Sequence, residues 1–181
     1  RTMPRYRRQS AGTTYFFTLV AYRRRPIFCD PIFRTALRRA IQTVRVTRPF
    51  AIDAWVLMPD HMHCIWTLPT DDNDYSTRWA EIKRYVSTAC RKHFYVPHLL
   101  TRSGKQRSES TIWQRRFWEH QIRDALDMEK HVDYIHFNPV KHGHVRQVGD
   151  WRYSTFHRYV REGIYVSDWA GTPEIAEWEL E

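Results

Sequence analysis

The sequence contains little cysteine and no long apolar run. Its three cysteines, Cys29, Cys64 and Cys90, include no CxxC pair. An odd number of thiols without paired spacing excludes a framework of disulfides and argues against a thiolate zinc site. Since no apolar stretch approaches about 20 residues, we expect no membrane-spanning segment. The first residues lack the apolar stretch of a signal peptide, so the expected location is the cytoplasm.

Acidic residues are absent from residues 1–25, which carry seven arginines, and basic residues are absent from residues 162–181, which carry six acids. The net charge of +9 favours a polyanionic partner, either a nucleic acid or an acidic membrane surface. A solvated basic face with an acidic tail is the simpler explanation of such charge runs. Arginines interleaved with aromatic residues at 113–118 favour nucleic acid, because arginine pairs with phosphates and flat rings stack on unpaired bases.

Aromatic residues are abundant, with eight Trp, ten Tyr and nine Phe, so we expect a packed core in a single compact domain. The periodicity of the apolar residues predicts alternating strands and helices. The expected elements are a strand at 14–21, a helix from Pro31 closed by Arg48-Pro49, strands at 50–57 and 61–68 around the turn Met58-Pro59-Asp60, a helix capped by Ser76, a mobile loop at 97–111, a strand at 111–122, and a helix from Asp124 to about Phe137 that Pro139 ends.

This order is the split βαβ plan of ferredoxin-like α+β folds, in which two helices cover one face of an antiparallel sheet. The last predicted helix is an addition to that plan. If this helix lies against the sheet, it brings Tyr134 close to a pair of histidines in the third strand. Tyr134 would then be placed to act as a nucleophile.

These histidines, His61 and His63, flank Met62 in a predicted strand. Side chains at i and i+2 of a strand project from the same face, so two imidazoles stand side by side there. Such a pair is half of a divalent-metal site. Packing against aromatic rings, or hydrogen bonding at a sheet edge, is the alternative explanation for the pair. The spacing excludes none of the other candidate ligands, which are His120, His131, His136, His142 and His144.

Tyr134 and Asn138 are four residues apart in a predicted helix and therefore share its face. Tyr134 is a candidate nucleophile, although a free phenol with a pKa of about 10 needs activation. Asn138 could supply a third ligand oxygen to Mg²⁺ or Mn²⁺. Packing at the inner edge of the helix is the ordinary role of such a tyrosine, and Asn-Pro is also a common helix stop.

Four motifs in order make the sequence resemble the REP-associated tyrosine transposases, relatives of the single-strand insertion-sequence transposases in the HUH endonuclease superfamily. The motifs are Trp55-Val56-Leu57-Met58-Pro59-Asp60-His61-Met62-His63, Ile112-Trp113-Gln114-Arg115-Arg116-Phe117-Trp118-Glu119-His120, His131-Val132-Asp133-Tyr134-Ile135-His136-Phe137-Asn138-Pro139-Val140-Lys141-His142-Gly143 and Trp151-Arg152-Tyr153-Ser154-Thr155-Phe156-His157. The resemblance covers residues 12–171, expected to form a single HUH nuclease domain between a basic arm at 1–11 and an acidic tail at 172–181.

The resemblance implies a ferredoxin-like core and metal-dependent cutting of single-stranded DNA at repetitive extragenic palindromes, which fold as hairpins beside short guide bases. His61 and His63 would bind the metal, Mg²⁺ or Mn²⁺, and Asn138 would be the third ligand. Tyr134 would form a 5′-phosphotyrosine, leave a free 3′-OH and rejoin strands by reversal. Relatives imply a monomer or a homodimer. We expect the protein in the cytoplasm, associated with the nucleoid.

For DNA contacts, charge and location favour Arg115, Arg116 and Arg123, together with an N-terminal basic segment that contains Arg5, Arg7 and Arg8. Two other functions compete with a tyrosine transposase. One is a non-catalytic binding module, since RNA-recognition domains also combine a ferredoxin-like sheet with exposed aromatic residues. The other is a metal nuclease that uses water, in which Tyr134 is structural.

Overall fold

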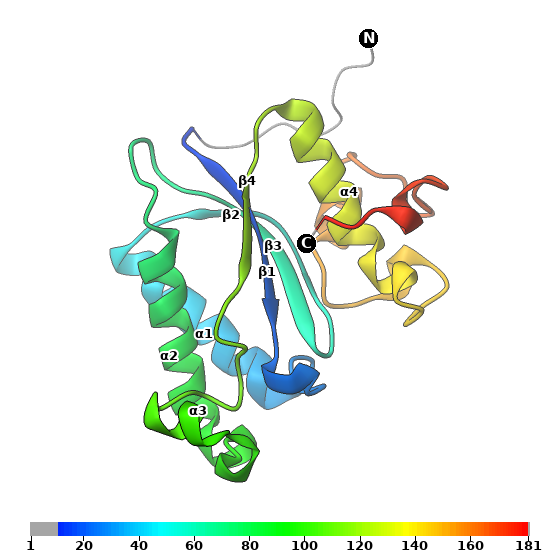
Figure 1. Cartoon of the computed structure of the whole chain (residues 1–181). Coiled ribbons are helices and arrows are strands. Elements are labelled where there is room, and N and C mark those ends of the chain that lie inside the picture. Colours follow the sequence, from blue (N-terminus) through cyan, green and yellow to red (C-terminus); the bar gives the residue numbers. More distant parts are fainter. Residues whose placement is uncertain (1–10, 181) are drawn as a thin grey trace.

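An antiparallel sheet forms the centre of the computed structural model, which describes residues 11–180 (Figure 1). The strands are β1 (Thr14–Val20), β2 (Ala51–Leu57), β3 (His61–Thr67) and β4 (Trp118–Gln121). They lie in the order β2-β3-β1-β4, and each neighbouring pair is antiparallel. This order is that of the split βαβ plan, so the predicted ferredoxin-like α+β fold is confirmed.

Helices cover both faces of the sheet (Figure 1). The α-helices are α1 (Pro31–Thr47), α2 (Tyr75–Phe94), α3 (Arg102–Gln106), α4 (Ala125–Lys141) and α5 (Phe156–Arg161), and the short 3₁₀ turns are η1 (Tyr22–Arg24), η2 (Pro97–Leu99), η3 (Val148–Asp150) and η4 (Ile175–Glu177). α1 and α2 pack together on one face, whereas α4 lies on the other face against β2 and β3. Within residues 11–180, no helix is both long and apolar enough to cross a bilayer.

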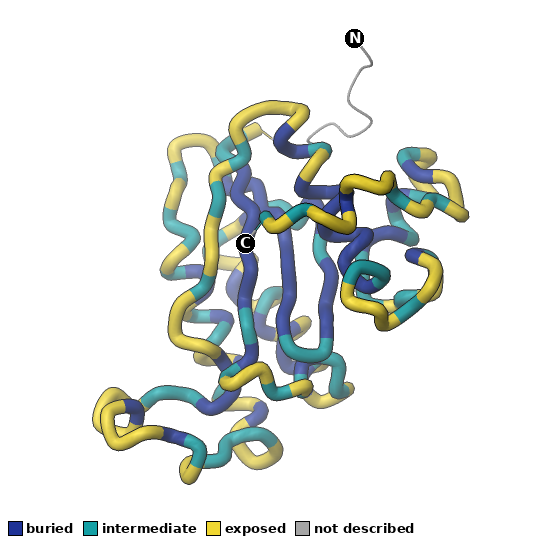
Figure 2. Tube along the Cα trace, turned by 45° about the vertical axis from the view of Figure 1, so that its right-hand side comes forward, coloured by how far each residue is buried: buried dark blue, intermediate teal, exposed yellow. Residues whose placement is uncertain are grey.

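The sheet separates two apolar clusters of buried side chains. The central strands β1 and β3 are buried along almost their whole length (Figure 2). Trp66 and Trp79 stack between the sheet and α2, with ring centroids 4.0 Å apart. Phe16, Val132 and Ile135 belong to the cluster between the sheet and α4. Full burial of one such side chain contributes roughly 1.5–3 kcal/mol, so both layers hold their helices firmly on the sheet.

The β2–β3 hairpin determines which face carries the histidines. Met62 and Cys64 point into the layer beneath α1 and α2. By the alternation of a strand, His61 and His63 point to the opposite face, toward α4. The predicted strands and the turn between them are confirmed, and the whole of β3 is buried.

α4 begins where the sequence predicts but ends later. The Asp124 carboxylate accepts a hydrogen bond from Asp127 N at 2.8 Å, which is an N-cap. The prediction that Pro139 ends the helix was wrong, because α4 continues to Lys141 with Pro139 inside it. A proline close to the end removes only one intrahelical bond, and Gly143, at a φ of 74°, then reverses the chain.

Three further boundaries differ from the predictions. Asp74, and not Ser76, caps α2, because its carboxylate accepts from Thr77 N. The segment 97–111, predicted as a mobile loop, contains η2 and α3. The strand predicted at 111–122 pairs only over β4, and Trp113 contributes a single bridge to Ala21. Periodicity does not reveal where a partner strand stops being available for pairing.

The C-terminal segment adds a further layer of contacts on the α4 side. Residues 153–155 run along β2, where Leu57 N donates to the Tyr153 carbonyl and Thr155 N donates to the Trp55 carbonyl. Ile175 is buried against the α4 layer. The segment 172–180, predicted as an acidic tail, is therefore packed against the fold at this point.

Candidate active site

His61 faces Asn138 across the boundary between β3 and α4. The His61 Nδ1 group donates to Asp60 Oδ1 at 2.7 Å, and His61 Nε2 lies 3.1 Å from Asn138 Oδ1. The bond to Asp60 fixes the imidazole tautomer and leaves a lone pair on Nε2. Two buried acceptor atoms, Nε2 and Oδ1, therefore face each other.

His63 lies beside His61, with ring centroids 4.9 Å apart. Its Nδ1 shares a hydrogen bond of 2.8 Å with the Thr18 hydroxyl of the neighbouring strand. Burial, followed by the nearby His61 and His142, holds the pKa of His63 well below its ordinary value. A neutral imidazole that is held by a hydrogen bond through one nitrogen can bind a metal through the other.

Tyr134 lies on α4 one turn before Asn138 and is 1% exposed. Its ring centroid is 5.4 Å from that of His63, and the two rings meet edge to face. Lys141 Nζ lies 5.1 Å from the centroid of the Tyr134 ring. The helix thus brings a phenol, an amide oxygen and a cation to the surface that carries the histidines.

The donor set of His61, His63 and Asn138, called here the HxH set, fits a divalent cation. The 3.1 Å between His61 Nε2 and Asn138 Oδ1 matches two adjacent ligands of an octahedral ion, which lie about 3 Å apart when each metal bond is about 2.1 Å. Asn138 Nδ2 is buried and has no hydrogen-bond partner among the described residues. Within this part of the chain, the polar contact of the side chain is therefore the one between its Oδ1 and His61. A cation bound here would take both atoms as ligands.

The comparisons with known proteins agree with these features. A family model described as "Transposase IS200 like" matches residues 9–138, a range that includes His61, His63, Tyr134 and Asn138. The chain belongs to the IS200-like transposase family. This transposase is 48% identical over 170 residues to the REP-associated tyrosine transposase of Escherichia coli (strain K12), covering 93% of this chain and 92% of the relative.

Another relative and a solved structure support the same assignment. The putative REP-associated tyrosine transposase of Haemophilus influenzae (strain ATCC 51907 / DSM 11121 / KW20 / Rd) is 41% identical over 181 residues, covering 96% of this chain and 97% of that protein. A solved REP-associated tyrosine transposase bound to a REP hairpin superposes with a TM-score of 0.74 at 48% identity, covering 92% of this chain and 91% of that chain.

The transposase contains a second group of metal-ligating side chains, His120, Asp127 and His131, called here the Asp127 cluster. Asp127 accepts from His120 Nε2 at 2.9 Å and from Arg123 N at 2.9 Å, and His131 Nδ1 lies 3.2 Å from its other oxygen. The two imidazoles are stacked and nearly parallel, at 13°. Both imidazoles face oxygens of Asp127 in these contacts, so the cluster joins β4 to α4 by hydrogen bonds.

Of the three remaining candidate ligands, two lie away from the HxH set. His136 is buried and bonded to the hydroxyl groups of Thr155 and Tyr165, and its pKa is lowered to about 3 by burial. His144 is exposed and lies beside Trp151. Only His142 approaches the HxH set among these three, with its ring centroid 5.1 Å from that of His61.

The arginines predicted to contact DNA are divided between the ends of β4. Arg115 and Arg116 are exposed just before the strand. Arg123 is exposed just after it, with Nε 3.6 Å from an Asp127 oxygen. The predicted contacts Arg5, Arg7 and Arg8 lie outside the described residues.

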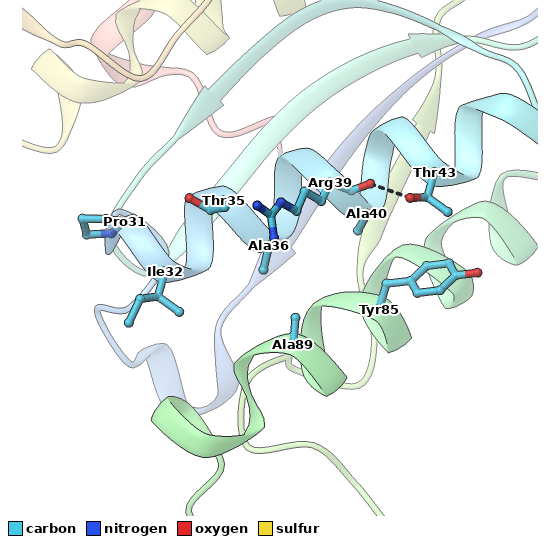
Figure 3. A pocket seen from close by; sticks show the side chains of 9 residues that line it. All are labelled: Pro31, Ile32, Thr35, Ala36, Arg39, Ala40, Thr43, Tyr85 and Ala89. Atoms are coloured by element: carbon cyan, nitrogen blue, oxygen red, sulfur yellow. Dashed lines mark hydrogen bonds between the residues drawn. The ribbon is translucent and has the colours of Figure 1, made fainter.

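Sequence reasoning missed the side chains that hold the histidines. Asp60 directly precedes His61, and a carboxylate beside a candidate metal ligand was the available signal. Thr18 lies in another strand, and its contact with His63 depends on the β1–β3 register, which pairs these two residues. The groove of about 510 Å³ between α1 and α2, lined by Ala36, Ala40 and Tyr85, is on the far face of the sheet and takes no part in this site (Figure 3).

Proposed function

We propose that this transposase is a metal-dependent endonuclease and strand transferase that cuts single-stranded DNA at REP-type palindromic hairpins. The observation that carries the proposal is the convergence of His61 Nε2 and Asn138 Oδ1 at 3.1 Å, beside His63 and the Tyr134 ring. The DNA substrate is suggested by the solved relative, which is bound to a REP hairpin.

His61, His63 and Asn138 would hold the ion, Mg²⁺ or Mn²⁺. When bound, the ion withdraws charge from phosphate oxygens and helps to orient the scissile group. Asp60 and Thr18 would keep the two imidazoles in the tautomer and orientation that this requires. The low pKa of His63 keeps its ring unprotonated at neutral pH.

Tyr134 would be the nucleophile. Its phenolic oxygen loses a proton to solvent and attacks the phosphorus, so that a tyrosine O–P bond forms while the bond from phosphorus to the 3′ oxygen breaks. The departing oxygen takes up a proton and becomes a free 3′-OH, and the DNA remains attached as a 5′-phosphotyrosine. Attack by a 3′-OH on this ester reverses the step and rejoins strands.

Lys141 would assist this step through its charge. Its ammonium lies over the Tyr134 ring, which places a positive charge beside the phenol. It also donates to the Trp178 carbonyl and lies 3.4 Å from Glu179 Oε1. Since Tyr134 is 1% exposed, a phosphodiester reaches it only when the packing around it opens.

The DNA would be held by Arg115, Arg116 and Arg123, with Arg5, Arg7 and Arg8 of the N-terminal arm, and binding should weaken steeply with salt. We place the protein in the cytoplasm, associated with the nucleoid, as a monomer or a homodimer. Residues 12–171 would be the nuclease domain, flanked by the arm at 1–11 and the tail at 172–181.

A denaturing gel tests the proposal. The full chain is incubated with labelled single-stranded palindromic DNA and Mn²⁺ or Mg²⁺, and a covalent adduct is expected that Tyr134→Phe abolishes. Cleavage retained by Tyr134→Phe would show that water is the nucleophile. Hairpin binding without any cut by the unmodified protein would leave a non-catalytic binding module.

A further inference from the structure

Trp118 is an exposed aromatic residue at the edge of the sheet. It is 51% exposed, although most of the aromatic side chains of the sheet are buried in the two apolar clusters. It begins β4, the edge strand whose burial pattern is mostly exposed (Figure 2). A tryptophan that leaves half of its surface in water on an edge strand gains only part of the free energy that burial would give, so its position suggests a further role.

The register places Trp118 on the same face as the HxH set. Phe117 contacts Phe17 and packs into the cluster beneath α2, so the next side chain points to the opposite face. Trp118 pairs directly with Thr18, whose hydroxyl bonds to His63 Nδ1. Two strand spacings, roughly 10 Å, therefore separate the tryptophan from this histidine.

The chain is basic on both sides of Trp118 along the sequence. Arg115 and Arg116 are exposed within three residues of it, and Arg123 is exposed beyond the other end of β4. Glu119 pairs with Phe17 and so points to the other face. α4 packs mainly on β2 and β3 and meets β4 at His120, two residues beyond Trp118, whose own side chain stays half exposed.

We propose that Trp118 is a stacking platform for an unpaired base of the DNA strand, next to the nucleotide whose phosphate enters the candidate active site. The inference rests on the proposed function, because the strand is taken to reach the HxH set. Every base has a flat face, so one ring accepts any of them, while Arg115 and Arg116 pair with the phosphates on either side. A duplex offers no free base face to this ring and gains nothing from it.

Binding without cleavage tests the platform. The full chain is titrated in EDTA with three fluorescein-labelled probes: dT16, a 16-residue strand with the same phosphates but abasic sugars, and a 16-bp duplex. Trp118→Ala should weaken dT16 binding about ten-fold, while Trp118→Phe should stay within about three-fold of the unmodified protein. Neither variant should change binding of the abasic strand or of the duplex.

Tyr85→Ala is the matched control. Tyr85 is 41% exposed on α2, on the far face of the sheet (Figure 3), and its removal should leave all three affinities unchanged. Unaltered dT16 binding by Trp118→Ala would overturn the platform. So would an equal loss on dT16 and on the abasic strand, because that loss reports on the backbone contacts or on the fold.

Adduct formation on a palindromic hairpin with single-stranded flanks separates this inference from the proposed function. Trp118→Ala should raise the DNA concentration for half-maximal adduct about ten-fold and leave the rate at saturation unchanged. No adduct with the unmodified protein, together with the expected dT16 result, would overturn the proposed function alone. A normal adduct with unchanged dT16 binding in Trp118→Ala would overturn the platform alone.

Discussion

The HxH set and the Asp127 cluster both join a strand to α4, yet they differ in how their polar atoms are satisfied. In the HxH set, two acceptors face each other at 3.1 Å. In the Asp127 cluster, the carboxylate accepts from His120 Nε2 and from the Arg123 backbone N–H. His131 Nδ1 bonds to the Asp127 carbonyl at 2.8 Å and lies 3.2 Å from the other carboxylate oxygen, and the two rings are stacked and nearly parallel. We therefore expect the ion at the HxH set, because the ligand atoms of the Asp127 cluster already make hydrogen bonds to one another.

Charge separates the two groups as well. Burial and hydrogen bonds act on the pKa of Asp127 in opposite directions, and the bonds from Arg123 N and His120 prevail, so the pKa is lowered and the carboxylate stays ionised. This negative charge is already matched by donors. Near His63 the charged neighbours that act on its pKa include Lys141 and Arg24. Both cations already face carboxylates, Glu179 and Asp60, and it is a bound divalent ion that would add positive charge at the HxH set, so metal and DNA should strengthen each other's binding there.

The largest expected effect is on DNA cleavage, which should depend on the HxH set and not on the Asp127 cluster. His63→Ala should reduce metal-dependent cleavage at least about a hundred-fold while leaving hairpin affinity mostly intact, because it removes a ligand and not a DNA contact. The matched variant His120→Ala should cleave within about three-fold of the unmodified protein. Adduct yields on a gel measure both, and loss of hairpin binding together with cleavage would make His63 structural.

A smaller effect is expected at the carboxylates behind the histidines. Asp60→Asn should lower Mn²⁺ affinity by roughly ten- to a hundred-fold, because it replaces the charged acceptor that orients His61 with a neutral and weaker one. Asp127→Asn should leave the Mn²⁺ affinity unchanged. Isothermal titration calorimetry measures the Mn²⁺ dissociation constant of each variant. An equal loss of affinity in the two variants would mean that the Asp127 cluster also binds the ion.

For the stability of the fold, the Asp127 cluster should matter more than for metal binding. Asp127→Ala should lower the free energy of unfolding by roughly 2–3 kcal/mol, because it leaves His120 and the Arg123 N–H without their partner at the start of α4. Asp124→Ala, which removes only the N-cap, should cost about 1 kcal/mol. Urea denaturation in the absence of metal measures both. Equal values would show that the cluster contributes no more than an ordinary cap.

The smallest effect concerns His136, a buried histidine that belongs to neither group. Its pKa of about 3 in the folded protein lies below the ordinary value of 6.5, so the unfolded chain binds more protons between these values and stability falls as the pH falls. From pH 6.5 to pH 5 the loss from this residue should be roughly 1.5 kcal/mol. Urea midpoints at both pH values should show a shallower dependence in His136→Gln than in the unmodified protein. An unchanged dependence would mean that burial does not hold His136 neutral.

Local patterns predicted the fold well where contacts are short-range. The alternation in β3 and the Asp124 cap of α4 both follow from neighbours in the chain. The predictions that failed concern places where tertiary packing overrides local preference. Pro139 lies within α4 because the helix is held against the sheet, and the strand predicted at 111–122 shrank to four residues because β1 pairs with only that part.

The sequence by itself determined that His61 and His63 share a strand face and that Tyr134 and Asn138 share a helix face, since both follow from backbone periodicity. Only the tertiary structure decided that these two faces meet, because the approach of α4 to β3 depends on apolar contacts between residues far apart in the chain. It also decided that His120 and His131 close on Asp127 while His61 faces Asn138. Hydrogen-bond partners across elements are set by packing at the ångström scale, which periodicity does not encode.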